Sequence, residues 1–458
     1  MNAYAKDLAT RISEKVANIS VIGLGYVGLN ISLAFASSGF PVYGYDIDTS
    51  KIQRLKKGEN YISEERNLGE LLPEVLDKNF FPSSNVEEAS LKGDVIIIIV
   101  PTADGDVPTI SYLEKALDSV RKNDIRGKLI VIESTVMVGT TEDFVRSRLE
   151  KDGLEAGIDF FIAYSPERID PGNPLMTFTK IPKVVGGVDE LSSDLGETLY
   201  GQVVEEVMRV SNARTAELVK LMENTQRDMN IALVNLFAMM CEEREIDVEE
   251  ALRAAATKWN FHRYHPSCGV GGHCLKKDPI LLAQSFQESK LDLSLIYSSR
   301  KINDTMPLVT AEKALSVAQH ILNKRIEDVR MGVLGLSYKK NSSDIRNSPA
   351  FSIISHLMGS GVRRLFMYDP LTNVEPQCKR ADIQNCDIVI YTVAHDGFDE
   401  IIASFNGHII DGTNTLEPSD RVFGVGRVLE DLKVSSIEDI LRSYPNLEKD
   451  FVIELKGQ

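Results

Sequence analysis

The sequence predicts an α/β protein in which two Rossmann-like, doubly wound domains are joined by a central helical region with one long helix. Short apolar runs alternate with helical stretches from about residue 18 to residue 210, and this alternation resumes after about residue 325. Between them, residues 212–245 carry apolar side chains at three- and four-residue intervals without Pro or Gly, which predicts a single helix. We expect domains at residues 1–210, 211–318 and 319–458.

The composition excludes several classes of protein. A chain of 458 residues with 43% hydrophobic and 26% charged residues is long enough for more than one core. Its net charge of -16 disfavours nucleic acid and anionic membranes as partners. The polar amino terminus does not resemble a secretory signal, and the longest dense apolar run, Val95–Val100, is too short to cross a bilayer. We expect a cytoplasmic protein with no membrane partner.

Six apolar runs in the first part of the chain are candidate strands of a parallel sheet. They are residues 18–25, 41–46, 94–101, 128–135, 159–166 and 183–187. After the first run, VIGLGYVG places Gly23, Gly25 and Gly28 in a GxGxxG pattern between a strand and a helix. Glycines at these positions permit a tight turn, close approach of a pyrophosphate to the helix amino terminus, and close helix–strand packing.

The end of the second strand identifies the dinucleotide. Asp46 follows Gly28 by eighteen residues, where an acid accepts a hydrogen bond from a ribose hydroxyl and repels the 2′-phosphate of NADP. We therefore predict NAD as the cofactor. The alternative is a glycine-rich turn that binds nothing, with Asp46 as a loop cap.

The third and fourth strands end in hydroxyl side chains. Thr102, Ser134 and Thr135 follow these strands, at the sheet edge where open α/β proteins bind ligands. Taken singly, each is more often a turn or cap residue. Their shared position at one edge indicates that they lie near the cofactor.

The stretch GVGGHCLKKDP, residues 269–279, gives Cys274 an unusual setting among the five cysteines. Three glycines precede it, and Lys276, Lys277 and Asp278 follow it. Nearby positive charge favours the thiolate, and glycines let a ligand approach backbone amides, so we predict that Cys274 is a nucleophile. The other cysteines lack such surroundings. Without a CxxC pair or a Cys/His cluster, the sequence predicts neither a disulfide framework nor a metal site.

An NAD site together with a reactive thiol suggests oxidation through a thiohemiacetal and a thioester, because a thiol adduct lets an aldehyde lose hydride. Such chemistry needs a donor for the developing oxyanion and a base for the hydrolytic water. Lys220 and Asn224, one turn apart on the predicted long helix, are candidate donors, although by themselves they form an ordinary solvated face. Asp278 is a candidate for orienting Lys220 or handling protons, with a loop cap as the plain alternative.

The strand pattern of the first part returns near the carboxyl terminus. Candidate strands there are residues 330–338, 363–370, 386–395 and 407–414. GLSYKK near residue 335 also echoes GLGYVG near the amino terminus. We therefore expect a second Rossmann-like domain.

Taken together, these motifs resemble the UDP-glucose/GDP-mannose dehydrogenase family over nearly the whole chain. The match includes GLGYVG, EST, SPER, LVKLMEN, GVGGHC with its KD, and GLSYKKNSSDIRNSP. The resemblance implies that two NAD⁺ oxidise a sugar C6 alcohol to a carboxylate. It also implies an amino-terminal NAD domain, a central helical dimerisation region with the reactive cysteine, a carboxyl-terminal UDP-sugar domain, and a homodimer or higher homo-oligomer.

The resemblance also implies roles for individual residues. Cys274 is implied as the nucleophile, Lys220 and Asn224 as oxyanion donors, and Asp278, Thr135 and Glu167 as groups that handle water and protons. The implied cofactor-binding residues are Gly23, Gly25, Tyr26, Val27, Gly28, Asp46, Thr102, Ser134, Thr135 and Arg346. The implied substrate-binding residues are Glu167, Arg168, Lys220, Asn224, Arg263, Gly271, Gly272 and Lys339. His262 and Arg263 stand where the family often has a basic residue that reaches the neighbouring subunit's site.

Two motifs resemble one branch of the family. SPERIDPGNP and GGHC are similar to enzymes that act on UDP-N-acetylhexosamines, such as UDP-N-acetylglucosamine or UDP-N-acetylmannosamine, whereas UDP-glucose enzymes more often show GGSC. Lys277 before Asp278, however, is closer to the UDP-glucose form. The sequence favours a UDP-N-acetylhexosamine 6-dehydrogenase that serves polysaccharide biosynthesis. The alternatives are a UDP-glucose 6-dehydrogenase and an NAD-binding protein without catalysis.

Overall fold

In a computed structural model, residues 2–62, 66–104, 107–169 and 177–427 are described. The chain divides into two compact units: the first is Met1–Glu223 with Leu281–Ser289, and the second is Asn224–Ile280 with Lys290–Gln458. Each unit contains a mainly parallel sheet, and one long helix runs through both, so the predicted fold class is confirmed. The three predicted domain ranges stay a prediction.

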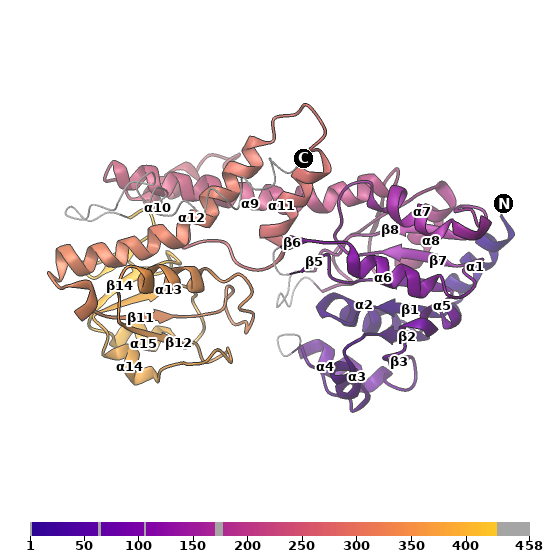
Figure 1. Ribbon diagram of the computed structural model, residues 1–458, viewed down its shortest axis with the longest axis horizontal. Coiled ribbons are helices and arrows are strands. Elements are labelled where there is room, and N and C mark those ends of the chain that lie inside the picture. Colours follow the sequence, from indigo (N-terminus) through magenta and orange to yellow (C-terminus); the bar gives the residue numbers. More distant parts are fainter. Residues whose placement is uncertain (1, 63–65, 105–106, 170–176, 428–458) are drawn as a thin grey trace. The chain divides into compact units, whose positions relative to one another are not determined.

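The first unit is built on an eight-stranded sheet (Figure 1). From edge to edge, the strands are β10 (Val207–Arg209), β9 (Lys183–Gly187), β8 (Phe161–Tyr164), β7 (Leu129–Ile132), β4 (Val95–Ile98), β1 (Ile19–Ile22), β2 (Val42–Tyr45) and β3 (Phe80–Ser83). The strands from β8 to β3 are parallel, and β9 runs antiparallel to β8. Strand order reverses at β1, which is where open α/β sheets bind ligands at the carboxyl ends of their strands. All six predicted strands are present.

The sequence patterns miss the two edge strands of this sheet. β3 contains Pro82, which lacks an amide donor and is tolerated at a sheet edge. β10 has three residues, none of them fully buried, so it leaves no apolar run to detect. Both strands pair only on one side, which explains why their sequences need little β character.

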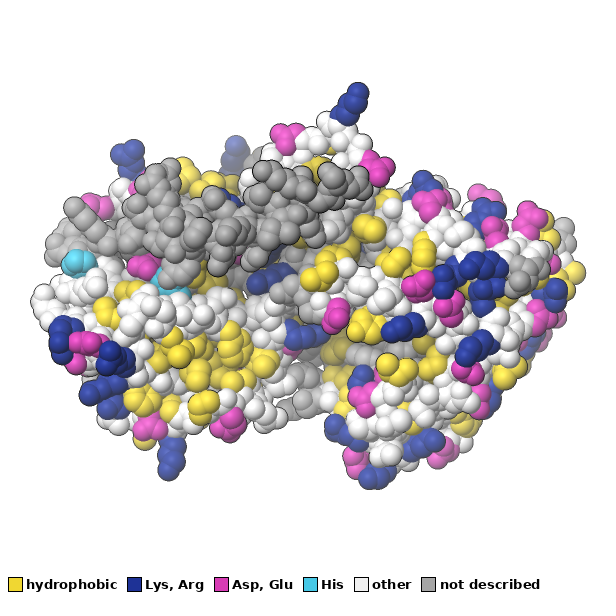
Figure 2. Space-filling view, in the orientation of Figure 1, with side chains coloured by type: hydrophobic (Ala, Val, Ile, Leu, Met, Phe, Trp, Pro, Cys, Tyr) yellow, Lys and Arg dark blue, Asp and Glu magenta, His cyan; other side chains and the backbone are white. Residues whose placement is uncertain are grey.

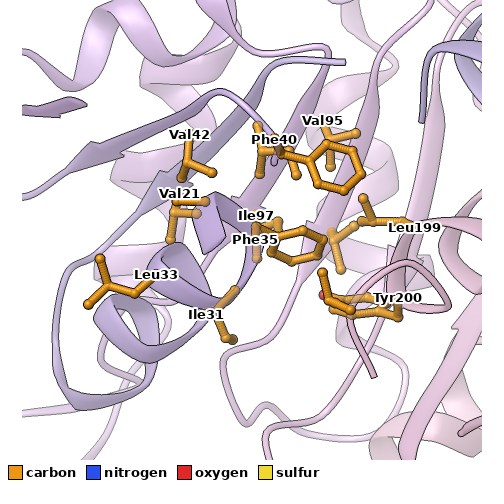
Figure 3. Packing of buried hydrophobic residues seen from close by; sticks show 14 of the residues in the cluster. Val21, Ile31, Leu33, Phe35, Phe40, Val42, Val95, Ile97, Leu199 and Tyr200 are labelled. Carbon is orange, nitrogen blue, oxygen red and sulfur yellow. The ribbon is translucent and has the colours of Figure 1, made fainter. Parts of the chain in front are cut away.

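Helices cover both faces of the first sheet (Figure 1). They are α1 (Ala3–Ser13), α2 (Tyr26–Ser37), α3 (Thr49–Lys56), α4 (Arg66–Val75), α5 (Ala89–Lys92), α6 (Ser111–Val120), α7 (Arg146–Leu149) and α8 (Glu190–Tyr200). A separate two-stranded hairpin, β5 (Ala103–Asp104) and β6 (Val107–Pro108), lies between α5 and α6 in the chain. Successive residues of β4 face opposite sides, because Val95 and Ile97 pack in one hydrophobic cluster and Ile96 and Ile98 in another. Figure 3 shows Phe35 of α2 in the cluster of Val95 and Ile97. Burial on both faces explains why this strand reads as a continuous apolar run.

The predicted long helix is α9 (Ala213–Glu243), with 31 residues. Its first part belongs to the first unit, and its part from Asn224 onward belongs to the second. The other helices of the central region are α10 (Val248–Ala255), α11 (Cys274–Ser285) and α12 (Ser294–Ser316), which continues as the π-helix η4 (Val317–Ile321). α9 and α11 therefore both supply residues to the two units.

The second unit contains a five-stranded parallel sheet. In spatial order its strands are β12 (Arg364–Tyr368), β11 (Arg330–Leu334), β13 (Ile388–Tyr391), β14 (His408–Asp411) and β15 (Val422–Gly424), and its helices are α13 (Pro349–Gly359), α14 (Arg380–Gln384) and α15 (Asp399–Ser404). The sequence patterns miss only the edge strand β15 among the described strands of this sheet. Asp369, directly after β12, accepts hydrogen bonds from the amides of Leu336 (2.7 Å) and Leu371 (2.9 Å). This carboxylate fastens the loop after β11 to the end of β12.

The molecular surface carries charges of both signs. On the face shown in Figure 2, basic and acidic side chains are interspersed rather than gathered by sign. Within the described ranges, none of the helices combines the length and apolar character that a bilayer crossing requires. The same ranges hold no cluster of three or more His, Cys, Asp or Glu side chains arranged to bind a metal ion.

Candidate functional site

The loop between β1 and α2 has the geometry that a pyrophosphate requires. Gly23 has a φ of +97°, and a Cβ there would lie 2.0 Å from the first carbonyl oxygen after β4. A Cβ on Gly28 would lie 1.8 Å from the carbonyl oxygen of Gly23. Gly25 is the N-cap of α2 and has open space at its Cβ position, so a phosphate has room to approach the helix terminus at Tyr26 and Val27. These residues fit the binding of NAD.

Asp46 is fastened to this loop by hydrogen bonds. Its carboxylate accepts from the amides of Leu24 and Asp48, each at 2.9 Å, and the side chain is largely buried. The Nζ of Lys51, in the first turn of α3, lies 3.3 Å from Oδ2 of Asp46. Sequence reasoning missed Lys51, although a cation shortly after the acidic strand end was a visible signal. The two amide bonds repeat those that Asp369 accepts in the second sheet.

The hydroxyl residues after β4 and β7 lie at neighbouring strand ends, as predicted. The hydroxyl of Ser134 accepts from the amide of Val100 and donates to its carbonyl oxygen, both at 2.8 Å. Ser134 therefore joins the ends of β4 and β7, and its hydroxyl is occupied by backbone. Thr102 is buried and Thr135 is half-buried. Their proposed contacts with the cofactor stay a prediction.

The SPER segment, after β8, holds its two charged residues by different means. Oε1 of Glu167 accepts hydrogen bonds from the amides of Arg168 (2.6 Å) and Ile169. The guanidinium of Arg168 donates to the carbonyl oxygen of Pro182 (2.7 Å) and forms an ion pair with Glu223 of α9 (2.6 Å). Arg168 thus has partners within the chain, and a role in substrate binding would require it to share or exchange them.

Cys274 is exposed and is the first residue of α11, whereas Cys268 and Cys386 are buried and Cys241 and Cys378 are half-buried. Burial raises the pKa of Cys268 and of Cys386 to about 12. Those two thiols are therefore poor nucleophiles near neutral pH. An exposed thiol at a helix amino terminus is in the environment expected of a reactive one.

The glycines before Cys274 pack against the loop after β11. A Cβ on Gly271 would lie 2.3 Å from the Cβ of Tyr338, and one on Gly272 would lie 3.0 Å from the Tyr338 ring. The amide of Gly272 donates to the carbonyl oxygen of Arg346 (2.9 Å), and the Asn347 side chain donates to the carbonyl oxygen of Gly272 (3.4 Å). Glycine is needed at both positions because a side chain would collide with Tyr338. The sequence instead suggested that these glycines serve the approach of a ligand to the backbone.

Asp278 lies one helical turn after Cys274 and has no exposed surface. The Asn224 side-chain amide donates to Oδ2 of Asp278 (2.5 Å), and Nζ of Lys277 lies 2.9 Å from Oδ1. The structure thus brings Cys274, Asp278 and Asn224 together within the second unit, and it adds Lys277. Lys220, four residues before Asn224 on α9, is half-buried and belongs to the first unit.

Two of the predicted basic binding residues, Arg346 and Arg263, have acidic neighbours within the second unit. Arg346 has an exposed side chain that bonds to both carboxylate oxygens of Asp344, with the shortest contact at 2.5 Å. Burial would raise the pKa of Asp344, but the bonds from Arg346 hold it below its usual value. Arg263 forms an ion pair with the buried carboxylate of Glu249 (2.5 Å), and Lys339 is half-buried. Whether Arg346, Arg263 and Lys339 contact ligands stays a prediction.

The backbone that follows the EST segment is held by a buried residue of α9 that sequence reasoning missed. Glu217 of α9 is fully buried, and its carboxylate accepts hydrogen bonds from the amides of Gly139 (2.5 Å) and Thr141 (2.7 Å). These amides begin the π-helix η2 (Thr140–Val145), which follows the EST segment. Burial raises the pKa of Glu217 from 4.5 to about 7.

Glu217→Gln is expected to change how stability depends on pH. The pKa of Glu217 is higher in the folded chain, so its contribution to stability is fully present below about pH 4.5 and is lost as the pH rises through about 7, at a cost of up to about 3 kcal/mol. Glutamine does not titrate. The melting temperature of the variant minus that of the wild type should therefore increase from about pH 5 to about pH 8. A constant difference over this range would contradict the prediction.

Comparison with known proteins gives a consistent result over all parts of the chain. The sequence matches the UDP-glucose/GDP-mannose dehydrogenase family in its NAD binding domain (residues 17–204), central domain (214–305) and UDP binding domain (332–418). It is 38% identical over 419 residues to the UDP-N-acetyl-D-mannosamine dehydrogenase of Pyrococcus horikoshii, covering 89% of this chain and 99% of that protein. The solved structure of the UDP-D-ManNAc dehydrogenase from Pyrococcus horikoshii has a TM-score of 0.82 at 37% identity, covering 90% of this chain and 99% of that one. The structure of the UDP-N-acetyl-mannosamine dehydrogenase Cap5O from Staphylococcus aureus has a TM-score of 0.79 at 31% identity, covering 90% and 98%.

Proposed function

The chain belongs to the UDP-glucose/GDP-mannose dehydrogenase family and is an NAD-dependent UDP-sugar dehydrogenase, and we propose that it oxidises the C6 alcohol of a UDP-N-acetylhexosamine to the carboxylate. The names of the relatives support UDP-N-acetylmannosamine as the first substrate to test. The observation that carries the proposed chemistry is the exposed Cys274 at the start of α11, with the buried Asp278 one turn later.

The proposed reaction has four steps. NAD⁺, which the glycine loop before α2 and Asp46 would hold, would supply the hydride acceptor for both oxidations. The C6 alcohol first loses a proton and a hydride and becomes an aldehyde; the Cys274 thiolate then adds to the aldehyde carbon, and the oxygen takes up a proton. Loss of the second hydride and of that proton gives a thioester, and water hydrolyses it to the carboxylate and the regenerated thiolate. One alcohol, one water and two NAD⁺ thus give one carboxylate, two NADH and three protons.

The surroundings of Asp278 support a role in handling water. Asn224 donates a hydrogen bond to one carboxylate oxygen, and the ammonium of Lys277, 2.9 Å from the other, offsets part of the cost of burying the negative charge. A carboxylate fixed in this way is oriented before substrate arrives, as a proton acceptor needs to be. We assign Asn224 and Lys220 to the oxyanion that forms on the sugar carbon. Thr135 and Glu167 keep their proposed roles with water and protons.

The yield of NADH tests this proposal. The purified protein is incubated with excess NAD⁺ and a limiting amount of UDP-N-acetylmannosamine, UDP-N-acetylglucosamine, UDP-N-acetylgalactosamine or UDP-glucose, with a sugar-free reaction as control. We expect two NADH for each molecule of a UDP-N-acetylhexosamine, because the thioester route removes two hydrides. One NADH for each sugar would contradict the thioester route. No NADH from any of the four would contradict the proposed substrate class.

A UDP-glucose 6-dehydrogenase is the second candidate, because Lys277 directly before Asp278 resembles the form found in UDP-glucose enzymes. If that resemblance is the better guide to substrate, UDP-glucose alone yields two NADH. The same set of sugars therefore distinguishes the two candidates. We further propose that the enzyme is cytoplasmic, as an enzyme supplied with free NAD⁺ and UDP-sugars would be.

We also propose that the enzyme is a homodimer or a higher homo-oligomer. Met222, Leu233 and Met240 lie on one face of α9 and are each about half exposed, at 55%, 48% and 54%. Their spacing of eleven and seven residues returns to the same side of a helix. Such an apolar stripe on a long helix supports self-association.

A further inference from the structure

The first unit buries a cluster of charges behind the EST and SPER segments. Lys183, the first residue of β9, places its Nζ 2.9 Å from Oε2 of Glu133 and 3.5 Å from Oε2 of Glu167. The ammonium also donates to the carbonyl oxygen of Pro166 (3.1 Å). The hydroxyl of Tyr200 donates to Oε1 of Glu133. The side chains of Glu133 and Lys183 are 0% and 4% exposed, and that of Glu167 is 12% exposed.

This cluster joins the two strand ends that carry proposed catalytic residues. Glu133 directly follows β7 and stands two residues before Thr135, while Glu167 follows β8. The cluster borders the apolar core at Tyr200. The ring of this residue lies among the hydrophobic residues of Figure 3, with its centroid 6.0 Å from that of Phe35. A buried ammonium in such surroundings interacts strongly with its carboxylates, because little water screens the charges.

The charges of the cluster do not balance. Two carboxylates share one ammonium, so full ionisation leaves a buried net negative charge. Burial raises the pKa of Glu133 to about 7, against the opposing effect of Lys183. Tyr200 of α8 is a further titratable group that contacts the cluster, and Arg168, next to Glu167 in the chain, pairs with Glu223 of α9. If Glu133 were protonated, Glu167 would be the remaining negatively charged partner of the Lys183 ammonium.

We propose that Lys183 is a positioning residue that supplies the positive charge beside the Glu167 carboxylate, and that Glu133 competes with Glu167 for the same ammonium. The inference rests on the proposed function, in which the Glu167 carboxylate handles protons. Lys183 acts through Glu167 and needs no contact with substrate. The amides of Arg168 and Ile169 hold the other oxygen of Glu167, so loss of the ammonium would alter the charge balance more than the position.

Two substitutions should shift the pH dependence of the reaction in opposite directions. In Lys183→Met, Glu167 loses its neighbouring positive charge, so the acidic limb of the kcat/KM profile should move up by about one pH unit or more. In Glu133→Gln, Lys183 interacts with Glu167 alone, so the acidic limb should move down. Lys183→Arg keeps the charge and should leave the limb close to that of the wild type. The measurement is NADH formation from the substrate identified above, at saturating NAD⁺, across the pH range.

Lys313→Met is the matched control for removing a buried lysine. Lys313 is 4% exposed, pairs with Glu242 and donates to the carbonyl oxygen of Gly424 (2.6 Å), all in the second unit. It should lose stability without shifting the acidic limb. The inference would be overturned if the acidic limb of the kcat/KM profile stayed in place in both Lys183→Met and Glu133→Gln. If Lys183→Met does not fold, Glu133→Gln alone decides: a downward shift of its acidic limb supports the inference, and an unchanged limb overturns it. A wild-type enzyme that forms no NADH from any UDP-sugar would instead count against the proposed function.

Discussion

Cys274→Ala is expected to lower the steady-state rate of NADH formation by at least about a thousandfold, because alanine cannot form the adduct from which the second hydride leaves. The thiol is exposed at the start of α11, so its removal leaves no buried cavity. The phosphate loop and Asp46 lie in the other compact unit. Affinity for NAD⁺, measured by calorimetry, should therefore stay close to that of the wild type.

Cys241→Ala is the matched control for this substitution. Cys241 is a half-buried thiol of α9 in the same unit, away from the proposed chemistry. Its variant should retain the wild-type rate. A Cys274→Ala enzyme that still produced two NADH per sugar at a comparable rate would show that the thioester route is wrong.

Arg300→Met is expected to lower the free energy of unfolding by about 3–5 kcal/mol, because it leaves a buried carboxylate without its counter-charge. The guanidinium of Arg300 in α12 bonds to Asp228 of α9 and to Asp304 (2.5 Å), and it reaches the carbonyl oxygen of Leu275 in α11 (3.4 Å). The side chains of Arg300 and Asp228 are 2% and 0% exposed. Denaturant unfolding that follows the second unit would measure the loss.

Two further variants test the cause of that loss. Asp228→Asn in the Arg300→Met background should recover part of the stability, because no uncompensated charge then remains buried between α9 and α12. Arg325→Met removes an arginine whose side chain is 74% exposed, and it should leave the free energy of unfolding nearly unchanged. Equal effects of Arg300→Met and Arg325→Met would contradict the assignment of Arg300 to a buried ion pair.

The family and the fold predicted from the motifs are confirmed. Both were predictable because they depend on local sequence patterns. A strand buried on two faces is a continuous apolar run, and a phosphate loop needs glycines at fixed spacing, so both are visible in the sequence. The edge strands β3, β10 and β15 were not predictable in this way, since strands that pair on one side tolerate proline, polar residues and short lengths.

The contacts that orient the side chains of the candidate site could not be predicted from the sequence, for a different reason. Asn224 and Asp278 are 54 residues apart, and Glu133 and Lys183 are 50 residues apart. No spacing rule links such residues, because the fold alone brings them together. The sequence also contained no signal that the Asp278 carboxylate would lie beside Asn224 and Lys277.

The matching hydrogen bonds of Asp46 and Asp369 bear on how such a chain diversifies during evolution. Each aspartate follows the second strand of its sheet along the chain and holds the loop after the first. Asp46 accepts from one amide of that loop and Asp369 from two, and each also accepts from the amide two residues downstream of itself. The acid therefore maintains the architecture whichever nucleotide the domain binds. We therefore expect the ligand preference of such a domain to change through its loops while the acid stays in place.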